Sequence, residues 1–164
     1  MFHDERGFFL ETYNRTQFEK TTGIDPDFIQ DNQSVSSYGV LRGLHFQTGK
    51  MAQAKLVRCI RGRVLDVVVD LRKESQTFGQ QFSVELTEEN QLQLFVPRGF
   101  AHGFITLSKK SVFSYKCDNY YDKASEGGII YNDATLAVDW HLPKEDFIVS
   151  EKDLELPSFL EVTQ

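Results

Sequence analysis

Two histidines and two cationic side chains have types and spacing that suit acid–base chemistry. His45 follows Arg42 by three residues within residues 39–47 (GVLRGLHFQ), and Lys55 comes ten residues after His45. His102 follows a Pro-x-Gly turn and enters an apolar segment. A neutral imidazole accepts a proton near pH 7, and lysine or arginine stabilises negative charge. The set predicts a site that removes a proton beside the carbonyl group of an anionic substrate.

A metal site is the first alternative. Pro97, Gly99 and His102 resemble the second histidine motif of the cupin superfamily, small jelly-roll barrels that often hold a metal ion. Metal-binding cupins usually take two histidines, one residue apart, and a glutamate from the first motif. This chain offers only His45 and the amide of Gln47 there. Since a transition-metal site needs three or four imidazole, thiolate or carboxylate ligands, we expect no metal.

Sequence patterns predict that the elements positioning these residues are strands. Residues 82–86 and 91–96 alternate between apolar and polar side chains, which indicates strands with one buried face. The residues expected on those buried faces are Phe82, Val84, Leu86, Leu92, Leu94 and Val96. Regular short strands bounded by turn residues favour an all-β fold, either a β-sandwich or a jelly-roll barrel.

The strand at residues 55–61 carries charge on both faces, so we expect one face to line a polar cavity. Gly62 predicts a hairpin turn between this strand and residues 64–71, because glycine tolerates the positive φ of tight turns. Only short helices are expected, at residues 16–22 and in a turn at residues 144–147.

Composition excludes several classes of protein. The 164 residues fit one domain, and the net charge of -6 with a pI near 5.2 argues against a nucleic-acid or membrane-surface binder. Cys59 and Cys117 lie in apolar contexts and are expected to be reduced core thiols. Asp66 and Asp70 interrupt the most apolar stretch, and the first residues lack the apolar run of a signal peptide. We therefore expect a cytoplasmic protein with no membrane partner.

Seven separated blocks resemble the dTDP-4-dehydrorhamnose 3,5-epimerases, the cofactor-independent isomerases of dTDP-L-rhamnose biosynthesis. They are residues 4–14 (DERGFFLETYN), 30–36 (QDNQSVS), 39–47 (GVLRGLHFQ), 53–58 (QAKLVR), 69–79 (VDLRKESQTFG), 96–104 (VPRGFAHGF) and 115–121 (YKCDNYY). The resemblance implies a cupin-type double-stranded β-helix with a few short helices. It also implies a single epimerase domain over residues 1–164 that lacks the family's usual first N-terminal strand, and it implies a homodimer.

The resemblance also assigns roles in catalysis. His45 falls on the family's base, Asp153 on the carboxylate that orients it, Tyr115 on the general acid of the opposite face, and Lys55 on the lysine that stabilises the enolate oxygen. The positions that contact the nucleotide sugar are Arg6, Glu11, Gln30, Asp31, Asn32, Arg42, His102, Glu126 and Lys152, with Tyr121 stacking on the thymine ring.

The implied reaction removes the C5 and then the C3 proton of dTDP-4-dehydro-6-deoxy-D-glucose and returns each from the other face, giving dTDP-4-dehydro-L-rhamnose. Two alternatives stay open. One is an enzyme that inverts only C3 or C5, or a ketoisomerase acting on a related dTDP-4-keto sugar. The other is a sugar-binding cupin without activity.

Overall fold

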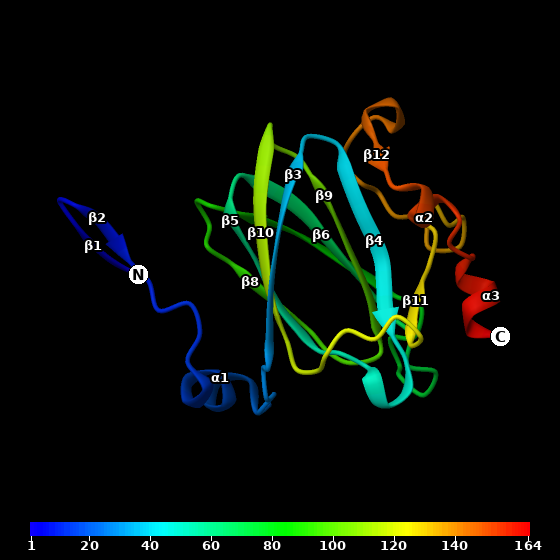
Figure 1. Cartoon of the computed structure of the whole chain (residues 1–164), viewed down its shortest axis with the longest axis horizontal. Coiled ribbons are helices and arrows are strands. Elements are labelled where there is room, and N and C mark those ends of the chain that lie inside the picture. Colours follow the sequence, from blue (N-terminus) through cyan, green and yellow to red (C-terminus); the bar gives the residue numbers. More distant parts are fainter.

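Two antiparallel sheets face each other in the computed structural model, which describes residues 1–164 (Figure 1). The first sheet has the strand order β3-β10-β5-β8, and the second has the order β11-β4-β9-β6-β7, with β12 parallel to β4. The expected all-β fold, a cupin-type jelly-roll barrel with a few short helices, is confirmed.

The first sheet is built from β3 (Gln30–Ser37), β5 (Lys55–Arg61), β8 (Gln93–Val96) and β10 (Lys110–Cys117). The second sheet is built from β4 (Val40–Gln47), β6 (Arg63–Asp70), β7 (Gln81–Thr87), β9 (Phe100–Thr106), β11 (Glu126–Gly128) and β12 (Ile148–Val149). The remaining elements are β1 (Phe2–Asp4), β2 (Gly7–Phe9), α1 (Arg15–Thr22), η1 (Gly49–Met51), η2 (Lys144–Asp146), α2 (Glu151–Leu154) and α3 (Phe159–Thr163). The helix expected at residues 16–22 and the turn at 144–147 are confirmed as α1 and η2.

The apolar residues form two separate cores. One fills the space between the sheets and consists of Val57, Cys59, Val64, Val68, Leu86, Val96, Phe104 and Phe113. The other lies between the second sheet and the C-terminal segment, and consists of Leu41, Leu44, Leu65, Val67, Val69, Ala101, Ile105, Ile129, Leu136, Trp140 and Phe159. The alternation of strand side chains therefore gives the second sheet two buried faces.

The C-terminal segment covers the second sheet along β4 and β11 (Figure 1). Trp140 is buried within it and satisfies its indole by donating from Nε1 to the Tyr131 carbonyl, at 2.9 Å. A buried aromatic or aliphatic side chain contributes roughly 1.5–3 kcal/mol. This layer, which sequence patterns did not indicate, is therefore a major part of the fold, and it carries Asp153.

Three sequence expectations are corrected. Gly62 forms the expected turn, but β5 and β6 do not pair as a hairpin, because the chain crosses there from one sheet to the facing one. Phe82 and Leu92 lie toward the ends of the predicted buried faces and are 56% and 50% exposed. Alternation fixes which side of a strand a residue occupies, but not whether another element covers that side.

Other expectations about burial are confirmed. Cys59 and Cys117 are buried and form no disulfide. The inner face of β5 carries Lys55 next to the core residues Val57 and Cys59, so this strand does line a cavity that is partly polar. None of the helices has the length and apolar composition that a membrane span requires.

The N-terminal hairpin, β1 and β2, stands away from the barrel (Figure 1). Its residues are exposed, and among them Phe2 and Phe9 are 74% and 68% exposed. The chain then reaches α1, which begins at an Asn14 cap whose side chain accepts from the Gln17 backbone N–H.

Candidate active site

Two adjoining cavities form a cleft in the barrel, and His45, Lys55 and Tyr115 line both of them. The cavities have volumes of about 570 Å³ and 220 Å³. Of the other predicted site residues, Arg42, His102, Lys152 and Asp153 line the larger cavity, and Gln30, Asn32, Tyr121 and Glu126 line the smaller one. The fold therefore brings residues from β3, β4, β5, β9, β10, β11 and α2 to one place.

His45 and Asp153 form a hydrogen-bonded pair on the wall made by the second sheet. His45 Nε2 lies 2.7 Å from Asp153 Oδ1, and Asp153 is 4% exposed. Burial by itself would raise the pKa of Asp153, but hydrogen bonds from His45, Gly43 and Ser150 and the charge of His45 together lower that pKa. An ionised carboxylate only accepts, so Nε2 must donate, and the lone pair of neutral His45 is then on Nδ1. His45 is therefore oriented to accept a proton at Nδ1.

The backbone at Gly43 approaches β9 closely and also binds Asp153. A Cβ atom at Gly43 would lie 2.6 Å from the Gly103 Cα and 2.7 Å from the His102 carbonyl oxygen, and the φ of Gly43 is +115°. The Gly43 N–H also donates to Asp153 Oδ2 at 3.3 Å. Ser150 caps α2 by accepting from the Asp153 backbone N–H. Gly43 and His45 thus hold the Asp153 carboxylate, and Ser150 holds the Asp153 backbone.

Tyr115 faces this pair from the other sheet. It lies on β10, opposite Val57 of β5 and Asn32 of β3. Burial raises the pKa of the Tyr115 phenol, and the charge of Cys117 adds to this effect while Arg42 opposes it. The phenol therefore keeps its proton at neutral pH and can act as an acid.

Lys55 places an ammonium group in the same cleft, next to Tyr115. Its Nζ lies 5.9 Å from the centroid of the Tyr115 ring and donates no hydrogen bond within the chain. Burial lowers the pKa of Lys55, against the attraction of Cys117, Asp66 and Glu126. A desolvated cation without a close partner strongly favours a ligand that gains negative charge.

His102 forms a second histidine–carboxylate pair beside the first. It is the cross-strand partner of His45, and its Nε2 lies 3.0 Å from both carboxylate oxygens of Asp66. Asp66 is fully buried, and burial raises its pKa, while the charges of His102 and Lys55 oppose this rise. Sequence reasoning noted Asp66 only as an interruption of an apolar stretch. A carboxylate in a strand that is otherwise buried is itself a signal, because buried charges require partners.

Polar residues close the rim of the smaller cavity. The Tyr121 hydroxyl donates to Glu126 Oε2 at 3.0 Å, and Lys152 Nζ donates to the same oxygen at 2.6 Å. These bonds outweigh the effect of burial and lower the pKa of Glu126, while the bond to Glu126 raises the pKa of Tyr121. In the larger cavity, Arg42 donates from Nε to Ser36 Oγ at 3.2 Å, which leaves its other guanidinium nitrogens available.

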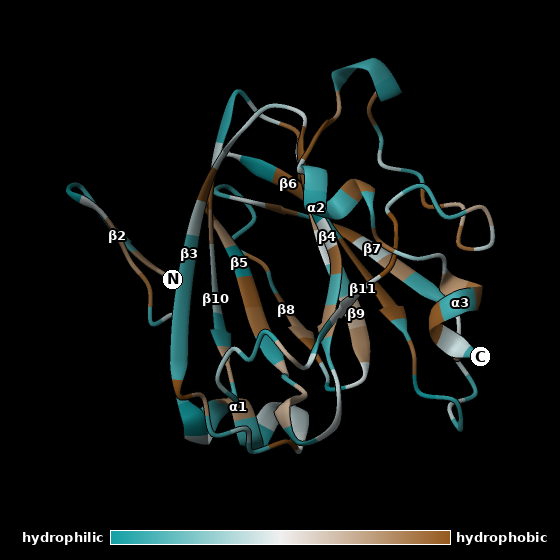
Figure 2. Ribbon diagram, turned by 45° about the vertical axis from the view of Figure 1, so that its right-hand side comes forward, coloured by the Kyte–Doolittle hydropathy of each residue, from teal (hydrophilic) through white to brown (hydrophobic).

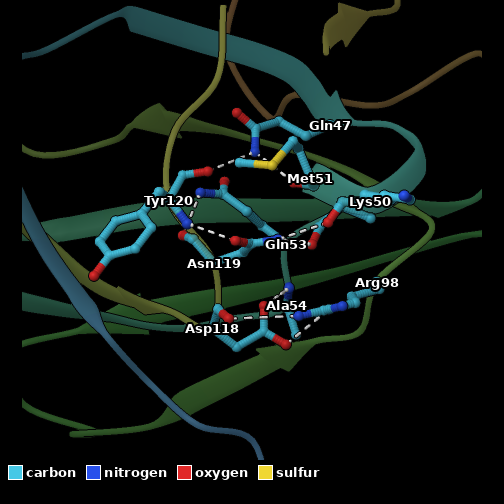
Figure 3. Close-up of polar contacts among 10 residues, drawn as sticks. Gln47, Lys50, Met51, Gln53, Ala54, Arg98, Asp118, Asn119 and Tyr120 are labelled. Atoms are coloured by element: carbon cyan, nitrogen blue, oxygen red, sulfur yellow. Dashed lines mark hydrogen bonds and ion pairs between the residues drawn. The ribbon is translucent and has the colours of Figure 1, made fainter.

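A network of polar contacts ties the segment after β10 to the segment between β4 and β5 (Figure 3). Asp118 accepts from the Ala54 backbone N–H at 2.6 Å and from Arg98 Nε at 2.9 Å. Gln53 donates to the Asn119 carbonyl at 2.8 Å. Gln47 belongs to the same network, which therefore fixes the path of the chain towards Tyr121.

Three predicted binding residues lie outside the cleft of this chain. Arg6 is on the exposed hairpin, where it pairs with Asp4, and Glu11 is on the exposed segment that follows. Asp31 points to the outer face of β3 and pairs with Lys116 at 2.9 Å, because neighbouring strand residues alternate in direction. Their binding roles stay predictions that this cleft alone does not support.

The donor set does not resemble a metal centre. No three His, Cys, Asp or Glu side chains lie together where they could hold a metal ion. His45 and His102 instead bond to separate carboxylates. The expectation that the reaction needs no cofactor stays a prediction.

The arrangement suits proton transfer at a carbon next to a carbonyl group. A base on one wall, an acid on the facing wall and a cation in the same cleft are the three groups that such a reaction needs. Placing the acid and the base on opposite sheets allows a proton to leave one face of a carbon atom and return to the other.

Comparison with known proteins identifies the family. A family model described as dTDP-4-dehydrorhamnose 3,5-epimerase matches residues 1–161. The chain belongs to the dTDP-4-dehydrorhamnose 3,5-epimerase family. Within this family, the enzyme of that name from Salmonella typhimurium is 52% identical over 160 residues, covering 96% of this chain and 85% of the relative.

Solved epimerase structures share the fold. The dTDP-4-dehydrorhamnose 3,5-epimerase from Elizabethkingia anophelis is 58% identical with a TM-score of 0.95, and the match covers 99% of this chain and 89% of that one. The dTDP-6-deoxy-D-glucose-3,5-epimerase from Legionella pneumophila, solved in complex with dTDP-4-keto-L-rhamnose, is 46% identical with a TM-score of 0.92. That match covers 96% of this chain and 82% of the Legionella chain.

Proposed function

We propose that this epimerase-family enzyme inverts C3 and C5 of dTDP-4-dehydro-6-deoxy-D-glucose to give dTDP-4-dehydro-L-rhamnose, in dTDP-L-rhamnose biosynthesis. The observation that carries the proposal is the placement of His45 and Tyr115 on facing sheets, with Lys55 lining the same cleft. Family membership and the ligand of the Legionella relative support the choice of substrate.

The first half of the reaction forms an enolate. His45 Nδ1 takes the proton from C5, and the electrons of the C–H bond move onto the C4 oxygen. The Lys55 ammonium and His102 stabilise the resulting oxyanion, and Asp153 stabilises the imidazolium that forms.

The second half returns a proton to the other face. The Tyr115 phenol protonates C5, the C4 carbonyl re-forms, and the centre is inverted. Tyr115 is then a phenolate and His45 carries the extra proton, so both exchange with solvent before the same steps invert C3. Each inversion therefore introduces one hydrogen atom from solvent.

The proposed binding roles follow the cleft. Tyr121 offers an exposed aromatic ring to a base, Arg42 and Lys152 offer donors to the diphosphate, and Gln30 and Asn32 offer amides beside the smaller cavity. The overall charge of the protein is negative, so recognition of the diphosphate must depend on these local cations.

Incubation with the 4-keto sugar nucleotide in D₂O, followed by NMR, tests the proposal. We expect one deuterium at C3 and one at C5 of the product. Label at only one of these carbons indicates the mono-epimerase alternative, migration of the carbonyl indicates the ketoisomerase, and binding of the nucleotide sugar without turnover indicates the non-catalytic cupin.

Two variants examine the assignment of base and acid. We expect His45→Ala and Tyr115→Phe each to lower kcat by about 10²–10⁴-fold, the usual contribution of a general acid or base. The Kd for thymidine diphosphate (TDP) should change little. Near-normal turnover in either variant would contradict the role given to that residue.

We also propose that two copies assemble as a homodimer in the cytoplasm. The exposed hairpin supports this proposal, since it presents the apolar side chains of Phe2, Phe8 and Phe9 and carries Arg6 away from the cleft of its own chain. In a dimer the hairpin would deliver Arg6 and Glu11 to the partner's cleft.

A further inference from the structure

Tyr121 is an exposed residue whose position depends on its backbone. Its side chain is 56% exposed, and its hydroxyl makes one hydrogen bond, to Glu126. The segment that carries it runs from the end of β10 to β11 and has no regular secondary structure between Asn119 and Asp122. Packing around the ring therefore contributes little to its placement.

Gln47 binds this backbone on both sides of Tyr121. Its Nε2 donates to the Tyr120 carbonyl at 3.1 Å and to the Met51 carbonyl at 2.6 Å (Figure 3). Its Oε1 accepts from the Asp122 N–H at 2.7 Å. Gln47 is 7% exposed, so these bonds are protected from water. One buried amide thus joins three backbone groups that have no partner in a sheet or helix.

The same residue is linked to the proposed base. Gln47 is the last residue of β4, two positions after His45 and on the same face of the strand. Its backbone is also the register partner of Glu126 in β11, where the segment returns to the sheet. The segment is therefore held by Gln47 at its middle and at its end.

A direct contact between Gln47 and a ligand does not explain this geometry. Gln47 lines the smaller cavity, but both of its N–H donors are used within the chain, which leaves only the second lone pair of Oε1 for a ligand. An amide also does not replace the carboxylate ligand of a metal-binding cupin motif. No cluster of His, Cys, Asp or Glu that could hold a metal ion surrounds Gln47. Gln47 therefore acts through other residues.

We infer that Gln47 is a positioning residue that fixes Tyr121 at a set distance from His45, so that a nucleobase and a sugar of one ligand reach both side chains. The inference rests on the proposed function, because it assumes that Tyr121 stacks on the base. The Gln47 amide would set how well the nucleotide binds, rather than how fast protons move.

The main test is Gln47→Glu, which keeps the shape of the side chain but places carboxylate oxygens against the carbonyls of Met51 and Tyr120. We expect KM for the keto sugar nucleotide and Kd for TDP to rise about tenfold or more, as the loss of one aromatic stacking contact would do. We expect kcat to fall by less than about threefold, because His45 and Tyr115 stay in place. Gln47→Met, which removes all three bonds without adding charge, should give the same KM-against-kcat split.

The matched control is Gln81→Glu. Gln81 also donates from its amide to a backbone carbonyl, that of Leu136, at 3.0 Å, but it lies on β7 away from the cleft. This variant should leave KM, kcat and Kd for TDP unchanged. An equal rise in KM in the control would overturn the inference, since it would show a general effect of losing an amide–carbonyl bond.

A double-mutant cycle with Tyr121→Ala decides whether Gln47 works through Tyr121. In the Tyr121→Ala background, Gln47→Glu or Gln47→Met should change Kd for TDP by less than about twofold, because coupled residues are not additive. A full tenfold effect in that background would overturn the inference. If the unaltered protein failed to bind TDP or turn over the sugar nucleotide, the proposed function would fail instead.

Discussion

Lys55 and Tyr115 share the interior of the cleft, and burial shifts their pKa values in opposite directions. It disfavours the charged form of each group, so the ammonium loses its proton more readily and the phenol holds its proton more firmly. Both groups must be protonated in the proposed mechanism. The alkaline limit of activity should therefore be set by Lys55.

This reasoning predicts the pH profile. Activity should be present below the pKa of folded Lys55 and should be lost as the pH rises through it, at a pH below the ordinary lysine value of 10.5. In Lys55→Arg, where the guanidinium stays charged, the alkaline limb should move up by about one pH unit or more. Measuring kcat/KM from neutral to alkaline pH in both proteins checks this, and identical limbs would show that another group is responsible.

Residue roles could be predicted from the sequence only in part. His45, Lys55 and Tyr115 stood out through a dense resemblance to one family, and the structure places them in one cleft. Asp66 did not stand out, because its partner His102 is 36 positions away and the pairing depends on β6 lying next to β9. For Asp31 the resemblance predicted a binding role, but Asp31 points away from the cleft. A matching motif does not tell which side of β3 faces the cleft.

Among the elements, β4 combines the greatest number of constraints. It pairs with β9, β11 and β12, carries Arg42 and His45, and approaches β9 at Gly43. The strand β3 is hydrophilic over most of its length (Figure 2), and its inner face supplies Gln30 and Asn32 to the cleft. The edge strands β3 and β11 therefore supply binding residues, while the central strands β4, β5 and β10 carry His45, Lys55 and Tyr115.

Close approach at Gly43 predicts a large effect of an added methyl group. Gly43→Ala combines strain at a φ of +115° with a clash against β9, each costing roughly 1–3 kcal/mol, so the free energy of unfolding should fall by their sum. Gly49→Ala is the control, because Gly49 also has a positive φ, of +61°, but nothing lies within 4 Å of its added Cβ. Denaturant unfolding of both variants measures the difference, and equal losses would refute the close-approach argument.

Sequence patterns gave boundaries for the strands at residues 55–61, 64–71, 82–86 and 91–96, and the structure has strands at about these places, but the patterns did not give their partners. Gly62 correctly marks the end of one strand and the start of the next, because a positive φ is a local property. Whether β5 and β6 pair or belong to facing sheets is decided by contacts with β8, β9 and β10, which are distant in sequence. The covering layer beyond Ile129 has little regular structure, so its sequence has no periodic pattern from which the layer could be predicted.

For the whole molecule, the N-terminal hairpin and the barrel have separate roles. Neither apolar core includes a residue from the hairpin, and the hairpin strands pair only with each other. In the proposed dimer the hairpin would instead contribute to assembly and to the partner's cleft.

Removing residues 1–10 tests this division. We expect the melting temperature of the barrel to stay nearly unchanged, and sedimentation to show a shift from dimer to monomer. Loss of the Arg6 contact should also weaken TDP binding by about tenfold or more, as the loss of a charged hydrogen bond does. A truncated protein that sedimented as the full chain does and bound TDP equally well would contradict the proposed role of the hairpin.

The two cores have a consequence for how this enzyme could adapt. The inner core includes residues of β5 and β10, which carry Lys55 and Tyr115, whereas Trp140, Phe159 and their neighbours lie behind the second sheet. Substitutions around Trp140 and Phe159 would keep the geometry between His45 and Tyr115 only where they leave α2, which carries Asp153, in place. Selection for life at a new temperature and selection for a new sugar could therefore proceed on different residues of one small chain.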